Sequence, residues 1–280
     1  MTKCGRISFS TDKGGARVIK DFIFRLTIGD CHLTRHLAAA LAFTTAVLTA
    51  GAQGGPPMIT DDPGTVEKGR WELNTALTTE RRPGETISEL PLLDLNYGVA
   101  ARWQLKYEVA WERLRDGSGR HDGPGNSLAG VKWRFCDLGE KSWQAATYPQ
   151  IEFNNPHSRA TERGLAESGS CLILPVQVMR DFDGISLNAD VGYLWHSAGG
   201  EEWYGGIVAG WKPRQGWEVA AELHWDSDAR VHATGLTANF GTRIRLSEEF
   251  SLLLSVGREL HNGRVPRATM VAYLGMQTRL

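Results

Sequence analysis

Charged side chains that could line a passage, or pair across it, recur at alternate positions along several stretches of the chain. They stand opposite apolar residues, and successive side chains of a strand point to opposite faces. An unpaired charge in a narrow interior is costly, so these charges must pair or stay hydrated. The candidates for such an interior are Lys106, Glu108, Lys132, Arg134, Glu152, Asp190, Glu218, Glu222, His224, Arg243 and Arg245.

This set carries both signs of charge, and two uses of it stay open. Cross-strand ion pairs would hold a barrel shut, whereas a polar constriction would select a small solute. Arg243 and Arg245 come shortly before a predicted turn, so they could instead line the mouth of the passage. The basic candidates for a constriction are Lys132, Arg134, Arg243 and Arg245, and the acidic ones are Glu108, Glu218 and Glu222.

Histidines close to serines raise lipid hydrolysis as an alternative function. The pairs are His196 with Ser197, and His224 with Ser227. Catalysis needs the hydroxyl and the imidazole within hydrogen-bond reach, but neighbours on a strand point apart. Neither pair lies in a Gly-x-Ser-x-Gly context, and no Walker loop, dinucleotide fingerprint, HExxH or CxxC motif occurs. We therefore predict no enzyme activity and no cofactor.

Two further groups of residues could bind metal or form a disulfide. Asp61 and Asp62 are paired carboxylates, but with Pro63 and Gly64 beside them a local turn is the favoured interpretation. We predict no metal site. Cys136 and Cys171 lack metal-type spacing. A disulfide between these two cysteines would suit an oxidising compartment, although no local pattern favours it.

The composition excludes several broad classes of protein. A formal net charge of -1 and a pI of about 6.7 predict no nucleic-acid partner. The mean hydropathy of -0.29 is low for a helical membrane protein. A membrane barrel tolerates this value, because half of each strand faces a wet lumen.

Alternation with a period of two dominates the chain after Ala52. The clearest stretch sets Phe250, Leu252, Leu254 and Val256 against serines and a glycine, with Leu253 as the exception. Aromatic residues bound several stretches, as in the belts of membrane proteins. Successive stretches begin near Gly69, Ile87, Ala101, Ser127, Gln144, Ser170, Gly184, Glu202, Gly216, Val231, Phe250 and Arg267. The pattern predicts an all-β fold over residues 69–280, a closed transmembrane antiparallel β-barrel of about twelve strands.

The predicted connections differ in length on the two sides of this barrel. The two longest, Arg115–Asn126 and Asn154–Gly169, fall on one side. External loops of bacterial barrels are longer than periplasmic turns, so we assign both connections to the cell exterior.

An apolar stretch from Leu37 to Ala50 reads as the core of a secretion signal. It is too short to span a bilayer, and a small-x-small site follows it. We predict a leader over residues 1–52, cut near Ala52, and a periplasmic segment over residues 53–68 that could plug the barrel. The alternating final strand ends at Leu280 and resembles the signal that the outer-membrane assembly machinery reads, although Phe is usual there. The predicted location is the bacterial outer membrane, with its lipid and that machinery as partners.

One short segment carries a family resemblance. Residues 56–74 read PPMITDDPGTVEKGRWELN, with Thr60, Asp61, Asp62, Pro63 and later Gly69, Trp71 and Glu72. This segment resembles the opening of the outer-membrane proteins grouped as "MetA pathway of phenol degradation". The resemblance implies a barrel linked to the degradation of aromatic compounds, and it assigns no binding residue.

Together these observations predict a porin-like channel for passive uptake of small solutes, with aromatic compounds as the class that the resemblance implies. A lipid hydrolase and a structural barrel with a salt-bridged, closed lumen are the alternatives.

Overall fold

The computed structural model describes residues 55–139, 142–182, 184–231 and 234–280, all within one compact unit of the chain. The expected leader at residues 1–52 lies outside these residues. Strands alone make up the named elements. They are β1 (Trp71–Arg82), β2 (Glu85–Ala100), β3 (Trp103–Asp116), β4 (Gly119–Asp137), β5 (Gln144–Thr147), β6 (Gln150–Phe153), β7 (Ser170–Phe182), β8 (Ile185–His196), β9 (Glu201–Arg214), β10 (Trp217–Asp228), β11 (Thr234–Arg245), β12 (Phe250–Asn262) and β13 (Met270–Arg279).

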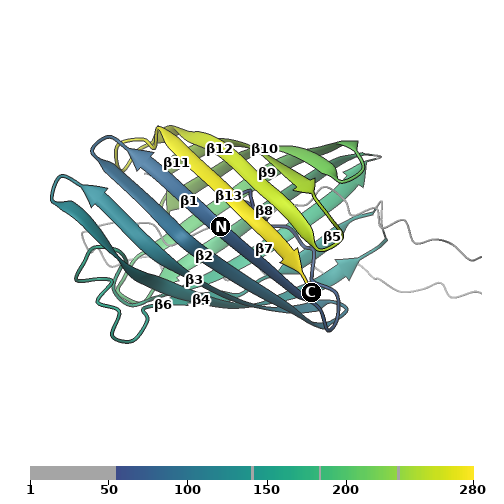
Figure 1. The fold of residues 1–280 in the computed structure, drawn as a ribbon, viewed down its shortest axis with the longest axis horizontal. Helices are drawn as coiled ribbons and strands as arrows, with labels where there is room; N and C mark the ends of the chain where they lie inside the picture. The colour runs from purple at the N-terminus through teal and green to yellow at the C-terminus, as the bar shows by residue number, and fades with distance from the viewer. Residues whose placement is uncertain (1–54, 140–141, 183, 232–233) are drawn as a thin grey trace, which may run out of the picture. The chain divides into compact units, whose positions relative to one another are not determined.

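Every strand pairs antiparallel with its neighbours, and the sheet closes on itself (Figure 1). The closing pair is β1 with β13, in register from Glu72 opposite Arg279 to Arg81 opposite Met270. The short strands β5 and β6 both pair with β4 and with β7, so they occupy one strand position between them. The thirteen strands of the sheet therefore fill twelve positions. The predicted closed antiparallel barrel is confirmed.

Residues Tyr148 and Pro149 separate β5 from β6. Proline has no N–H to donate to a ladder, so it interrupts a strand inside a sheet. Tyr148 is 2% exposed, and its ring lies beneath the ammonium group of Lys132. The interruption thus coincides with an aromatic side chain inside the barrel.

The two faces of the wall have the polarity that the alternation predicted. Apolar side chains such as Leu105, Leu187 and Phe240 are exposed on the outer face. Polar side chains between them, such as Glu108 and Asn188, are buried on the inner face. A barrel that sits in lipid has this arrangement.

Among the residues that the structure describes, no helix has the length and apolar character needed to cross a membrane.

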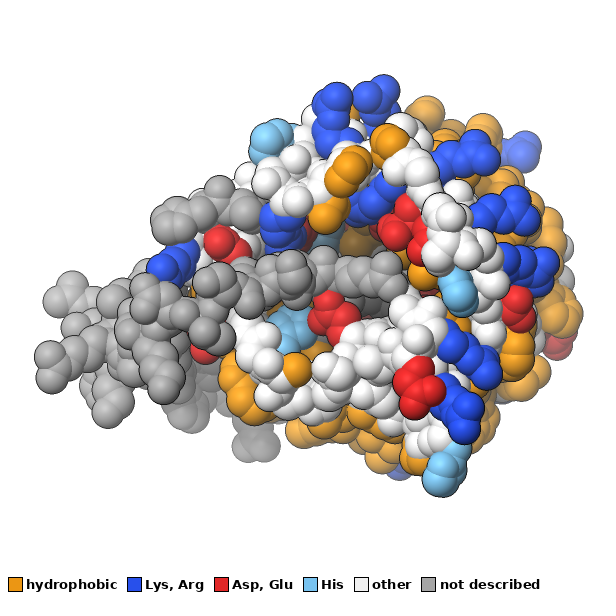
Figure 2. Space-filling model, turned by 90° about the vertical axis from the view of Figure 1, so that its left-hand side faces the viewer, with side chains coloured by type: hydrophobic (Ala, Val, Ile, Leu, Met, Phe, Trp, Pro, Cys, Tyr) orange, Lys and Arg blue, Asp and Glu red, His pale blue; other side chains and the backbone are white. Residues whose placement is uncertain are grey.

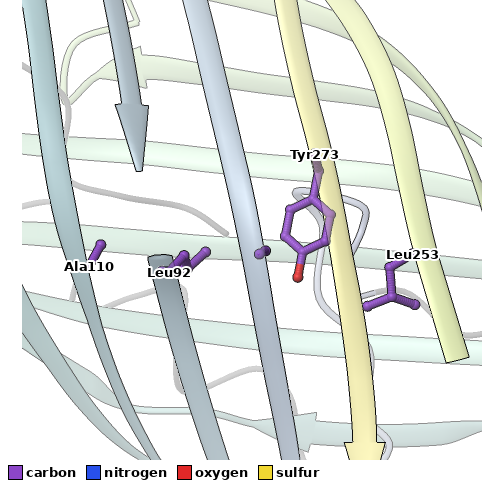
Figure 3. Packing of buried hydrophobic residues seen from close by; sticks show 5 residues of the cluster. Leu92, Ala110, Leu253 and Tyr273 are labelled. Carbon is purple, nitrogen blue, oxygen red and sulfur yellow. The ribbon is translucent and has the colours of Figure 1, made fainter. Parts of the chain in front are cut away.

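An apolar patch interrupts the polar interior. Leu92, Ala110, Leu253 and Tyr273 lie together on β2, β3, β12 and β13 (Figure 3). Leu253, the exception in the alternating stretch of β12, is fully buried because it points to this patch. Its position explains why an apolar residue stands on the polar face of that strand.

One predicted loop is wrong, because strands replace most of Arg115–Asn126. β3 and β4 stay paired to their tips, where Asp116 stands opposite Gly119. The other long connection, residues 154–169, joins β6 to β7 as expected. Ala160 and Leu165 of this connection pack on Leu114 of β3. Residues 154–169 are therefore anchored on the long β3–β4 hairpin, which stands where the other loop was predicted.

Candidate functional site

Residues 55–66 precede the first strand and lie inside the barrel; we call them the lumen segment. Met58, Thr60 and Asp62 of this segment are 2%, 0% and 7% exposed. The hydrogen-bond partners of the lumen segment as a whole belong to β3, β4, β8, β10, β11 and β12, on the inner face of the wall. The candidate site is the set of wall residues that holds this segment.

Wall carboxylates accept hydrogen bonds from the backbone of the segment. Glu222 of β10 accepts from the N–H groups of Ile59, at 3.1 Å, and Thr60, at 2.5 Å. Asp190 of β8 accepts from the N–H of Asp61 at 3.2 Å. Three consecutive amides of the segment are therefore fixed by two buried acids.

Lys132 of β4 binds Asp61 and Asp62 of the lumen segment from another side of the barrel. Its ammonium Nζ donates to Oδ1 of Asp61 at 3.1 Å and to the carbonyl of Asp62 at 2.7 Å. Nζ also lies 4.5 Å from the centre of the Tyr148 ring, within range of a cation–π interaction. Asn188 donates to the carbonyl of Asp61 at 2.8 Å.

The start of the segment is held by β11 and β12. Arg243 donates to the carbonyl of Pro56 at 2.7 Å, and its guanidinium lies 3.8 Å from the carboxylate of Glu218. Ser255 donates to the carbonyl of Pro57 at 2.8 Å. Prolines have no N–H, so these carbonyls are the polar groups that the backbone offers here.

Glycines on the wall make room for the segment. A Cβ atom at Gly206 would collide with the Thr60 hydroxyl, and one at Gly241 would collide with the Met58 methyl group. At Gly98 a Cβ atom would collide with the backbone carbonyls of Val66, the last residue of the segment, and of Glu67 beside it. The absence of a side chain at these wall positions is thus matched to the segment.

His224 of β10 lies beside the seat of Thr60. In the ladder, Gly206 stands opposite Asp190 on one side and His224 on the other. The His224 ring stacks on Tyr204, with ring centres 6.0 Å apart. Asp190, Gly206 and His224 therefore form a row across β8, β9 and β10. The hydroxyl of Thr60 occupies the space that a side chain at Gly206 would need.

A chain of neutral amides lines the wall opposite this row. Gln277 donates to Asn74, Asn74 and Asn96 both donate to Asp94, and Gln104 donates to Asn96. Gln104 also accepts from the N–H of Val66 at 2.8 Å, which joins the chain to the lumen segment. Sequence reasoning missed these amides as site residues, because it selected charged side chains.

Lys106 lies next to this chain and is paired within the wall. Its ammonium group is 3.3 Å from the carboxylate of Asp94 and 2.9 Å from that of Glu108. Glu108 is itself 2% exposed. The pair with Asp94 of β2 joins two strands, as in the hypothesis of a barrel held shut by ion pairs, whereas Glu108 lies on β3 with Lys106.

One end of the barrel holds the C-terminal Leu280. The opposite end carries a separate set of charged side chains. Arg82 binds both carboxylate oxygens of Glu259, each at 2.9 Å. Arg264 pairs with Asp226 and lies 3.5 Å from Glu202. Basic side chains gather along the upper and right-hand rim of this end, with acidic side chains among them and farther in (Figure 2). We call Arg82, Glu202, Asp226, Glu259 and Arg264 the mouth cluster.

The remaining predicted site residues lie toward the barrel ends. Glu152, at 8% exposure, accepts a hydrogen bond from Asn126 at 2.9 Å. Arg134 is half-buried and donates to the carbonyl of Ala101 at 3.1 Å. Arg245 is exposed at the end of β11, outside the contacts of the lumen segment.

The two aspartates of the segment differ in acidity. Burial raises the pKa of Asp62 to about 6, although Lys132 opposes that rise. Burial also acts on Asp61, but the charges of Lys132 and Lys106 outweigh it and hold the pKa of Asp61 below its ordinary value. Asp61 is thus the ionised partner of Lys132 near neutral pH.

The structure corrects the disulfide alternative and shows what the two serine hydroxyls contact. Cys136 is a free cysteine, so the disulfide with Cys171 is not formed. Ser197 accepts from the N–H of Ser170 at 2.8 Å, and Ser227 donates to the carbonyl of Asp228 at 3.0 Å. These serine hydroxyls bond to backbone rather than to the nearby histidines. In the described part of the chain, no group of acidic, histidine or cysteine side chains is arranged to hold a metal ion.

Solved structures similar to this chain are outer-membrane barrels. The COG4313 outer membrane channel from Pseudomonas putida F1 aligns with a TM-score of 0.63 and 11% identity, over 78% of this chain and 98% of that one. The NanC porin aligns with a TM-score of 0.51 and 10% identity, over 74% of this chain and 100% of that one. At these identities the likeness concerns the fold. No protein-family model matches the sequence, and no curated protein matches it.

Proposed function

We propose that the protein is a bacterial outer-membrane channel for passive uptake of small solutes, closed by its own lumen segment. The observation that carries this proposal is the kind of contact that holds the segment. Glu222, Asp190 and Lys132 bind it through hydrogen bonds and one ion pair, all of which can exchange for water or solute. The segment also buries the apolar side chains of Pro57, Met58 and Pro63, and these contacts are reversible too.

The wall supports a location in the outer membrane. Its outer face is apolar and includes exposed Trp71, Trp103, Trp195 and Trp211 at strand ends, as in an aromatic girdle. The interior is polar, which suits a water-filled passage once the segment moves. The partners in this proposal are membrane lipid, the assembly machinery that inserts the barrel, and a small solute.

The solute class of the proposal includes aromatic compounds. Support for this point is the resemblance of residues 56–74 to the phenol-degradation group. Tyr148 and Tyr204 place aromatic rings inside the barrel, where they could contact such a solute.

Conductance in planar bilayers tests the channel. We expect refolded mature protein to open rarely, and a variant lacking residues 55–64 to conduct steadily. The Arg245→Gln variant is the matched control, because it removes a charge outside the segment's contacts. A segment-free barrel that stays silent would favour the alternative of a structural barrel with a closed lumen.

A further inference from the structure

The cations inside the barrel differ in where their carboxylate partners come from. Lys106 pairs with Asp94 and Glu108 of the wall, and Arg82 pairs with Glu259 of the wall. Lys132 instead takes Asp61, at 3.1 Å, from the lumen segment. The wall can thus keep Lys106 and Arg82 neutralised by itself, whereas the pairing of Lys132 ends when the segment leaves.

Departure of the segment would remove both acceptors that it offers to the Lys132 ammonium group, the carboxylate of Asp61 and the carbonyl of Asp62. The Tyr148 ring belongs to the wall and would still cover one side of this group. An anion that pairs with the ammonium group in place of Asp61 would therefore favour the released state of the segment.

The acids on the facing wall define the rest of the ligand. Glu222 and Asp190 lose the N–H donors of Ile59, Thr60 and Asp61 when the segment leaves. A ligand that carries a hydroxyl or amino donor beside its anionic group can replace these donors. Glu222 also accepts from Asn239 at 3.0 Å, which holds the carboxylate in place for such a ligand.

We propose that Lys132, with Glu222 and Asp190, forms a binding site for small organic carboxylates that carry a hydroxyl or amino group, and that such a solute opens the channel by displacing Asp61. This inference rests on the proposed channel function and names the substrate class of the same site. Binding and opening are coupled because the carboxylate of the solute takes the place beside Lys132 that Asp61 occupies in the docked segment.

The experiment compares three probes of similar size on the wild-type protein in planar bilayers at neutral pH. They are 4-hydroxybenzoate, neutral 4-hydroxybenzyl alcohol and cationic tyramine. We expect 4-hydroxybenzoate to raise the open probability about fivefold or more, a typical coupling between two binding events. The alcohol and tyramine should leave it near its starting value. Equal responses to all three probes would overturn the inference.

Two substitutions locate the effect. Lys132→Met should abolish the response to 4-hydroxybenzoate, whereas Lys132→Arg should retain part of it. Asp61→Asn should raise the basal open probability, because it weakens the competing contact while leaving Lys132 in place. If Lys132→Met does not refold to a β-sheet circular dichroism spectrum, the Asp61→Asn result and the probe comparison decide the question. A normal response in refolded Lys132→Met would contradict the assignment of the site.

The segment-free variant separates this inference from the channel itself. A conducting segment-free barrel, combined with a wild-type protein indifferent to 4-hydroxybenzoate, would overturn the carboxylate site and leave the channel standing. A segment-free barrel that is silent would overturn the proposed function and the inference together.

Discussion

The two ends of the barrel interior use the same side-chain types in different ways. In the mouth cluster, arginines pair with acids of other parts of the wall, as Arg82 of β1 does with Glu259 of β12. Toward the other end, Glu222 and Lys132 direct their charges at the lumen segment. Charges that pair within the wall stabilise the barrel, whereas charges that pair with a separate segment can exchange that segment for something else.

The largest effect should follow from Glu222→Ala. This change removes the acceptor of the Ile59 and Thr60 amides. Hydrogen bonds to a charged group contribute about 1.5–3 kcal/mol each. We therefore expect docking of the segment to weaken by about 3 kcal/mol, which is on the order of a hundredfold in the population of the open state. Single-channel recording measures it, and an unchanged open probability would remove Glu222 from the mechanism.

A second change sharpens the comparison from the mouth cluster. Arg82→Met should lower the free energy of unfolding by about 2 kcal/mol, because it strands the buried carboxylate of Glu259. We expect no change in open probability, because Arg82 does not contact the lumen segment. Urea unfolding in detergent and bilayer recording give the two values. A raised open probability with an unchanged free energy of unfolding would show that the mouth cluster also controls opening of the channel.

The pH dependence should be smaller. The pKa of Asp62 is raised to about 6 in the docked segment and has its ordinary value of 3.8 once released. Docking is thus most favourable below the lower value and weakens as the pH rises through about 6. Lys132 of β4, Arg243 of β11 and Asp61 surround this carboxyl.

We expect the open probability to rise about tenfold between pH 5 and pH 7, because Asp62 loses its proton in the docked segment over this range. Asp62→Asn should flatten this rise, while Arg245→Gln should preserve it. A profile of the same slope in Asp62→Asn would assign the pH dependence to another group.

The sequence predicted the barrel because strand alternation is a local signal. Each stretch carries its own apolar and polar faces, so every strand position could be located without knowledge of its partner. The prediction of a loop over Arg115–Asn126 was wrong except at the turn of residues 117 and 118, because Gly119, Gly123, Pro124 and Gly125 lie in β4. There the pairing with β3 outweighs the weak strand propensity of these residues.

The site was harder to predict. The charged members of the wall, such as Glu222 and Lys132, follow from the alternation. Their partners do not, because these contacts join residues 70 or more positions apart and often use backbone amides, as between Thr60 and Glu222. Glycines such as Gly206 give no sign in the sequence that they face a docked segment.

Cross-linking the segment to the wall tests the central claim most directly. Met58→Cys and Gly241→Cys place two thiols where the Met58 methyl group meets the wall, in a protein whose Cys136 and Cys171 are replaced by serine. We expect the oxidised double variant to stay closed, even with 4-hydroxybenzoate present, and to conduct after reduction. Equal conductance before and after reduction, with the disulfide shown by mass spectrometry, would contradict a gate formed by the lumen segment.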